Sequence, residues 1–348
     1  MGKTIKMVSI IIPTYDEQNN LPTLYDRLVS VASDNPSYDF EFIFIDDCSS
    51  DETPSILQDK TNVDHRVKII RFARNCGSHA AVAAGLQFCR GDAAIMLAAD
   101  LQDPPEIIPR LLLEWGKGFK VVWGARDKRE GECFLTLAIS RTFYFLMNGF
   151  TDIRQPPTGA DVFLIDRAVI NAFKAAPEKN TSVTMLISWL GFSQTSIEYV
   201  KQARHAGSSK WTTTKKIKLF FDSLISFSYA PLRFMSLIGA ISAFLGLLYS
   251  VDVFIDALGG IPVKGWASLM IVVLVIGGLQ MSMLGMLGEY LWRTYDEARG
   301  RPRYVIEKNT LLDATSNCGE IQRTVDRSRN RAISEKDTSE KQEGDEKS

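Results

Sequence analysis

Two long runs without a charged residue are the feature that most constrains how this chain folds. They cover residues 234–251 and 266–288, and each approaches the roughly 20 apolar residues that a helix needs to cross a bilayer. Aromatic side chains lie near their ends, as in membrane proteins, namely Tyr249, Trp266, Tyr290 and Trp292. A buried helical hairpin of a soluble protein is the alternative. The pattern favours a two-helix transmembrane hairpin over residues 233–292.

The charges outside the hairpin predict its orientation. Residues 252–265, between the two runs, hold one lysine, whereas both outer flanks are rich in Lys and Arg. The positive-inside rule then places both flanks on the cytoplasmic side. The apolar run at residues 8–13 is too short for a signal peptide. We therefore expect a multi-pass protein of the cell (inner) membrane, with its large amino-terminal domain and both termini in the cytoplasm.

Three segments adjoin the hairpin. In residues 211–232, apolar and aromatic residues alternate with lysines, which is typical of an amphipathic helix lying in a membrane interface. An ordinary surface helix is the alternative for that juxtamembrane segment. Residues 293–309 are expected to form a cytoplasmic segment. Residues 310–348 lack aromatic residues and carry many charges of both signs, so we expect a disordered tail.

Residues 1–210 have the pattern of an α/β domain with a mostly parallel sheet. Strand-like runs, each followed by a polar or glycine-containing loop, occur at residues 8–13, 40–46, 67–71, 93–98 and 119–124. Between them, apolar residues recur at helical spacing, as at Leu21, Leu24, Leu28 and Val31. A formal net charge of −1 gives no sign of a nucleic-acid partner. Five scattered cysteines indicate neither a disulfide framework nor a thiolate zinc site.

Polar clusters follow three of the predicted strands, at residues 13–17, 46–51 and 99–106. In open α/β sheets the ligand crevice lies at the carboxyl ends of the strands, so these clusters are candidate ligand contacts. Carboxylates there could accept hydrogen bonds from a base or a ribose, although Asp and Ser also populate ordinary turns. In the third cluster, Asp100 and Gln102 could bind Mg²⁺ or Mn²⁺ on one face, and Asp103 could cap the next helix, a role that is compatible with metal binding.

The order of these segments resembles one known family. IIIPTYDE, FIDDCSSDET, ADLQDPPE, PTGADVFLIDR and RHAGSSKW precede the membrane hairpin. This order is similar to the polyprenyl-phosphate branch of glycosyltransferase family 2, which includes bactoprenol glucosyltransferases and dolichyl-phosphate mannose synthases. The resemblance covers roughly residues 5 to 305. It implies a GT-A fold, a nucleotide-diphosphate-sugar donor, a divalent metal, and inverting transfer to a polyprenyl phosphate lipid at the cytoplasmic face of the membrane.

The resemblance also implies roles for individual residues. The base and ribose of the donor would contact Pro13, Tyr15, Glu17 and Asp47. The metal and diphosphate would be bound by Asp100 and Gln102. The loop that closes over the phosphates would contribute Arg204, Ser209 and Lys210. The acceptor phosphate would be bound by Arg126 and Arg141.

Two points qualify the catalytic assignments, which are Asp161 and Asp100. Many family members have Asp-x-Asp-x-Gln, but Ala98 stands here in place of the first Asp, which removes one carboxylate from the metal site. A phosphate monoester with a second pKa of about 6 is already largely a dianion at neutral pH. Asp161 would therefore align the nucleophile more than deprotonate it. His79 is an alternative base, although capping or packing is the more ordinary role for it.

The resulting hypothesis is transfer of glucose from UDP-glucose to undecaprenyl phosphate, for modification of a cell-surface glycan such as O-antigen. Mannose, N-acetylhexosamine and aminoarabinose donors remain open, and so does a flippase partner. A processive polysaccharide synthase is disfavoured because two membrane helices are too few for a polymer channel. A non-catalytic scaffold or nucleotide-sugar sensor is a third hypothesis. Small residues at four-residue spacing, Gly239 with Ala243 and Gly278 with Ser282, would allow helix packing in a homo-oligomer.

Overall fold

The structure is a computed structural model that describes residues 5–126, 160–176, 178, 181–202, 230–258 and 265–313. Most of the expected juxtamembrane segment and of the expected tail therefore lies outside the described residues. The described strands are β1 (Lys6–Thr14), β2 (Tyr38–Asp46), β3 (Val67–Phe72), β4 (Ala93–Met96), β5 (Val121–Arg126), β6 (Ala160–Asp166), β7 (Gln194–Tyr199) and β8 (Ile306–Asn309). They form one eight-stranded sheet in the order β7-β5-β6-β4-β1-β2-β3-β8.

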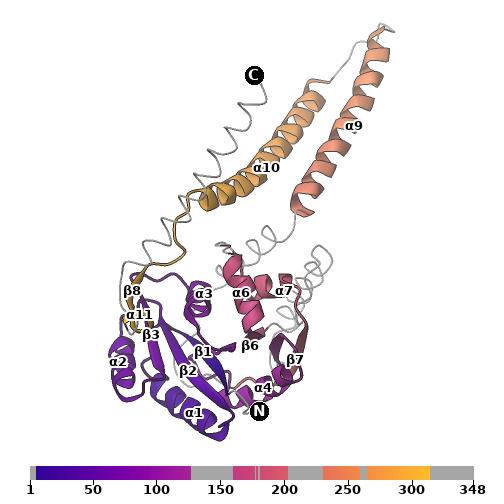
Figure 1. The fold of residues 1–348 in the computed structure, drawn as a ribbon. Helices are drawn as coiled ribbons and strands as arrows, with labels where there is room; N and C mark the ends of the chain where they lie inside the picture. The colour runs from indigo at the N-terminus through magenta and orange to yellow at the C-terminus, as the bar shows by residue number, and fades with distance from the viewer. Residues whose placement is uncertain are drawn as a thin grey trace, which may run out of the picture.

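Strands β6 and β8 run antiparallel to their neighbours and the other pairings are parallel, so the expected α/β class and mostly parallel sheet are confirmed. The helices of this domain are α1 (Leu21–Asp34), α2 (Thr53–Val63), α3 (Ser78–Phe88), the 3₁₀ turn η1 (Pro105–Ile107), α4 (Ile108–Gly116), α6 (Arg167–Ala175), α7 (Val183–Trp189) and α11 (Thr310–Asp313). Figure 1 shows helices on both faces of the sheet.

Side-chain alternation along the central strands separates two buried layers. In β1, Val8, Ile10 and Ile12 belong to a cluster that includes residues of α1 and α4. Ile11 belongs to the cluster on the other face, which includes residues of α3, α6 and α7. A parallel strand covered on both faces is mostly apolar, which explains the isoleucines at residues 10–12. The buried exception in β1 is Ser9, whose hydroxyl donates to Glu41 and accepts from the Gly91 amide.

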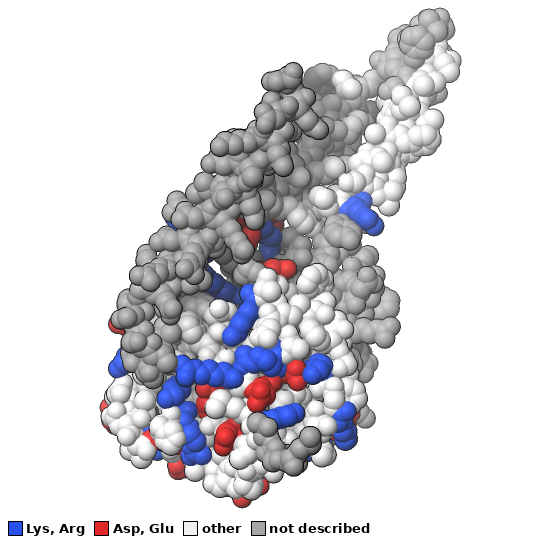
Figure 2. Space-filling view, in the orientation of Figure 1, with Lys and Arg blue, Asp and Glu red and all other residues white. Residues whose placement is uncertain are grey.

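Two long helices follow the domain, α9 (Ala230–Leu258) and α10 (Trp266–Ala298). Each contains a span long and apolar enough to cross a membrane, Leu232–Tyr249 in α9 and Leu269–Ala298 in α10, and neither span is buried in the protein. Figure 1 shows both helices extending away from the sheet, and the described side chains on the projecting part in Figure 2 are almost all uncharged. A helix that is apolar all round and uncovered requires an apolar surrounding, which favours association with a membrane.

The chain returns to the sheet after α10, and this was missed in the sequence. The segment expected to be a cytoplasmic connection contains β8, which pairs antiparallel with the edge strand β3. Helix α11 follows directly, so the expected tail does not begin at residue 310. Leu311 is buried against the domain. A four-residue strand with two charged residues has too weak a local pattern to be recognised without its partner.

Candidate active site

The order of the strands places a topological switch point between β1 and β4. From β1 the chain passes to β2 and then β3 on one side, and α3 returns it to β4 on the other side of β1. The loops that follow β1 and β4 therefore leave in opposite directions. Such a switch point is where open α/β sheets bind their ligands, and the clusters at residues 13–17 and 99–106 lie on either side of it.

The backbone is held in an unusual conformation in all four loops that follow β1 to β4. One residue in each loop has a positive φ, namely Asp16 at 50°, Cys48 at 63°, Gly77 at 88° and Leu101 at 59°. Left-handed geometry costs an ordinary residue roughly 1–2 kcal/mol. Strain of this kind persists only where the surrounding structure enforces it, and it gathers at functional sites. The positive φ values single out this edge of the sheet as the candidate active site.

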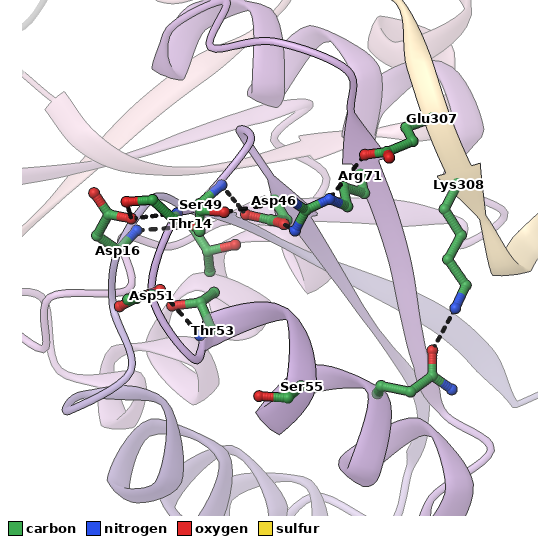
Figure 3. A network of polar contacts seen from close by, with 12 residues as sticks. Thr14, Asp16, Asp46, Ser49, Asp51, Thr53, Ser55, Arg71, Glu307 and Lys308 are labelled. Atoms are coloured by element: carbon green, nitrogen blue, oxygen red, sulfur yellow. Dashed lines mark hydrogen bonds and ion pairs between the residues drawn. The ribbon is translucent and has the colours of Figure 1, made fainter.

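Hydrogen bonds join the loops after β1 and β2 into one unit, shown in Figure 3. The Asp16 amide donates to Ser49 Oγ at 2.9 Å, and the Ser50 amide donates back to Asp16 Oδ1 at 2.8 Å. The Glu17 amide donates to Thr53 Oγ1 at 2.9 Å. Asp16 and Ser49 belong to the polar clusters noted in the sequence, but neither was given a role of its own, because hydrogen bonds between residues 33 positions apart leave no local pattern.

The Asp47 carboxylate binds the loop after β3. Asp47 is buried, and it accepts hydrogen bonds from the Cys76 amide at 2.6 Å and from the Gly77 amide at 2.8 Å. Burial raises the pKa of Asp47 above its ordinary value, and the two backbone amides only partly oppose this. Each carboxylate oxygen has a second lone pair, so the same group could also accept a hydrogen bond from a ligand.

The other predicted contacts to the base and ribose lie at the end of β1. Pro13, Tyr15 and Glu17 are each half-buried, on the same edge of the sheet as Asp47. Glu17 Oε2 accepts a hydrogen bond from Asn20 Nδ2 at 2.6 Å, which ties the loop to the start of α1. The structure thus brings these predicted residues to one place.

The predicted metal residues share one turn after β4. The Gln102 amide donates to Asp100 Oδ1 at 3.2 Å, with Leu101 between them in the left-handed region. No group of three or more His, Cys, Asp or Glu residues is placed to hold a metal within the described parts of the chain. Asp100 and Gln102 offer carboxylate and amide oxygens, the type of ligand that a hard divalent ion such as Mg²⁺ takes alongside substrate phosphates and water.

Asp103 immediately precedes Pro104, the N-cap residue of η1. Asp103 is fully buried, and it accepts a hydrogen bond from the Tyr199 hydroxyl at 2.5 Å. Its carboxylate also lies 3.9 Å from Lys201 Nζ. Through these contacts the turn that carries Asp100 and Gln102 is attached to the end of β7. The RHAGSSK segment begins shortly after β7 in the sequence.

Burial lowers the pKa of His79 to about 4, with the Arg303 charge acting in the same direction. A side chain with that pKa is neutral and only weakly basic at neutral pH, which argues against His79 as the catalytic base.

The remaining predicted residues are described in part or not at all. Asp161 is in β6, where Phe163 pairs with Met96 of β4, so the backbone of Asp161 lies toward the carboxyl end of β4. Arg126 is the last residue of β5 and pairs with Tyr199, which brings it to the same edge of the sheet. The structure describes the backbone but not the side chains of these two residues. Arg141, Arg204, Ser209 and Lys210 lie outside the described residues.

Comparison with known proteins gives a consistent result. Residues 9–173 match the family model described as Glycosyl transferase family 2. The uncharacterized glycosyltransferase YkcC of Bacillus subtilis is 38% identical over 86% of this chain and 93% of its own. The SfII prophage-derived bactoprenol glucosyl transferase of Shigella flexneri is 35% identical over 87% of this chain and 98% of its own. Among solved structures, the mannosyltransferase PcManGT of Pyrobaculum calidifontis, in complex with GDP-Man and Mn²⁺, is 16% identical, covers 82% of this chain and 87% of its own, and gives a TM-score of 0.42.

Proposed function

Since this chain belongs to glycosyltransferase family 2, with the GT-A architecture expected of it, we propose that it transfers a hexose from a nucleotide-diphosphate sugar to a polyprenyl phosphate. The observation that carries the proposal is the combination, in one chain, of polar loops at the β1/β4 switch point and two uncovered apolar helices. The switch point is where open α/β sheets bind nucleotides, and the helices suit a lipid acceptor.

Glucose and undecaprenyl phosphate are the proposed sugar and acceptor. The supporting observation is the similarity to the Shigella flexneri protein, which spans 98% of that relative and so extends through both apolar helices. The cytoplasmic face of the membrane is the proposed site of reaction, because the basic flanks of the hairpin favour that side. Use of the lipid-linked sugar outside the cell would then require a flippase.

The proposed reaction is a single displacement with inversion. An oxygen of the lipid phosphate forms a bond to the anomeric carbon, and the bond from that carbon to the diphosphate oxygen breaks, so that the nucleoside diphosphate leaves with the electron pair. Asp100 and Gln102 would hold a divalent ion, which would neutralise the negative charge of the departing diphosphate. Asp161 would align the acceptor phosphate, and Asp47, Tyr15 and Glu17 would hold the nucleoside.

The experiment is transfer from radiolabelled UDP-glucose to undecaprenyl phosphate by the detergent-purified full chain, with Mg²⁺ or Mn²⁺ and with chelator. We expect chelator-sensitive label in a single lipid-extractable monosaccharide product. Asp100→Asn should reduce turnover about 10²-fold or more, because an electrostatic contact to developing charge is removed. Asp39→Asn is the matched control, because this exposed residue lies at the amino end of β2, opposite the site.

The outcomes separate the competing hypotheses. Full turnover in Asp100→Asn would refute the metal assignment. Activity only with another nucleotide sugar would replace glucose as the donor and keep the reaction class. Binding of UDP-glucose without transfer from any donor of a panel would favour the nucleotide-sugar sensor.

A further inference from the structure

The segment that follows α10 is attached to the carboxyl-terminal part of β3, from Ile69 to Phe72. Strand β8 pairs with β3, and the Tyr304 ring stacks on Phe72 with centroids 4.9 Å apart. Thr310 Oγ1 accepts a hydrogen bond from the Ile69 amide at 2.9 Å. In α11, which follows β8, the Leu311 carbonyl accepts a hydrogen bond from Arg90 Nη2 at 3.1 Å. These contacts fix the position of β8 against the strand that precedes one of the four site loops.

Arg71 of β3 connects β8 to the donor site. Its Nε donates to Glu307 Oε2 at 2.9 Å, and its Nη1 donates to Asp46 Oδ2 at 2.5 Å. Its Nη2 points to the Ser49 carbonyl at 3.4 Å. The guanidinium is planar with donors in a fixed fork, so the contact at Nε sets the direction of the two terminal nitrogens. Figure 3 shows Arg71 between Glu307 on β8 and Asp46.

Asp46 in turn determines the shape of the loop after β2. Its Oδ1 accepts a hydrogen bond from the Ser49 amide at 2.9 Å, and the Ser49 hydroxyl binds the Asp16 amide in the loop after β1. The Asp46 side chain is only 1% exposed, whereas that of Glu307 is 57% exposed. A buried carboxylate depends strongly on its cation, so the position of Arg71 matters more to Asp46 than to Glu307.

Arg71 borders an open pocket of about 460 Å³, which is also lined by Asp46, Ser49 and Lys308 and by residues of α2. Because the side chain is not enclosed on that side, its polar contacts contribute to its orientation. Lys308 also lines the pocket, and its Nζ donates to Gln58 Oε1 of α2 at 2.7 Å.

We propose that Glu307 is a positioning residue for donor binding, which acts through Arg71 on Asp46 and Ser49 and thereby on the loops that carry Tyr15 and Asp47. Strand β8, which follows α10, thus helps to hold the loops of the donor site in position. Donor affinity depends on how this strand is docked, which couples the membrane anchor to the soluble domain. The inference rests on the proposed function for the identity of the ligand, but not for the coupling of β8 to the loops.

The test uses the full chain in detergent with three variants. Glu307→Gln removes the charge of the acceptor, Arg71→Lys keeps the cation but loses the fork, and Lys308→Gln is the matched control on the same strand. UDP and GDP binding is measured by calorimetry, and donor KM and kcat are measured separately. Hydrogen exchange of the Asp16, Ser49 and Ser50 amides reports the loops without any ligand.

We expect Glu307→Gln to raise the donor KM about three- to tenfold, as for partial loss of a charge-assisted contact, with kcat changed less than about twofold. Arg71→Lys should produce the larger change, and exchange of the loop amides should rise in both variants. Lys308→Gln should change neither quantity. Equal effects of Lys308→Gln and Glu307→Gln, or wild-type KM and exchange in both Glu307→Gln and Arg71→Lys, would overturn the inference.

The two proposals fail in different ways. If the wild-type chain binds neither UDP nor GDP and transfers no sugar, the proposed function is wrong. The exchange of the loop amides then decides the coupling by itself. Faster exchange in Glu307→Gln supports it, and unchanged exchange overturns it.

Discussion

Gly77 is the position where a single methyl group tests the strained geometry of the site. Its φ of 88° and ψ of 160° lie in a region that only glycine adopts readily. A Cβ added at Gly77 would have no atom within 4 Å, so Gly77→Ala creates no clash and no new packing. The cost is therefore backbone strain alone, about 1–3 kcal/mol. If the backbone relaxes instead, the Gly77 amide turns away from the buried Asp47 carboxylate, which costs a similar amount.

The assay is thermal unfolding of the full chain in detergent, followed by UDP titration. A loss of about 1–3 kcal/mol should lower Tm by about 2–4 °C for each kcal/mol in a domain of this size, and UDP affinity should fall about tenfold. Gly116→Ala is the control, because a Cβ at this helical position also has no neighbour within 4 Å and φ there is not positive. That variant should be neutral or stabilised by about 0.5–1 kcal/mol. Wild-type Tm and UDP affinity in Gly77→Ala, or an equal loss in Gly116→Ala, would refute the reasoning.

Two further predictions concern carboxylates outside the donor loops. The hydrogen bond from Arg66 lowers the pKa of Asp64 from 3.8 to about 2, with further contributions that include the Tyr25 hydroxyl. The stability that this carboxylate contributes is therefore present above about pH 4 and is lost as the pH falls toward 2. The unfolding free energy should fall between pH 7 and pH 2 by about 2 kcal/mol more in the wild type than in Asp64→Asn. An identical pH dependence in the two proteins would contradict the assignment. Tyr199→Phe removes the hydroxyl that donates to the buried Asp103. We expect a loss of about 1–3 kcal/mol in unfolding free energy and a raised donor KM. A variant as stable as wild type would show that this hydrogen bond does not support the turn that carries Asp100 and Gln102.

Much of the fold was predictable because its signals are local. The runs at residues 8–13 and 40–46 became β1 and β2, and Leu21 to Val31 became the buried face of α1. Each of these elements is recognisable from the spacing of its own apolar residues. The two uncharged runs likewise became α9 and α10, although both helices extend beyond the expected spans. Strand β8 was missed because its residues pair with β3, more than 230 positions away in the chain.

The sequence by itself determined which chemical groups stand after each strand, and Asp47, Asp100 and Gln102 lie where that pattern placed them. Only the tertiary structure decided how these groups are held. The left-handed Cys48 and Leu101, the Asp103–Tyr199 hydrogen bond and the contact of Glu307 with Arg71 have no counterpart in local spacing. The physical reason is that periodicity records which face of an element is buried, whereas the conformation of a loop depends on partners that folding brings to it from distant parts of the chain.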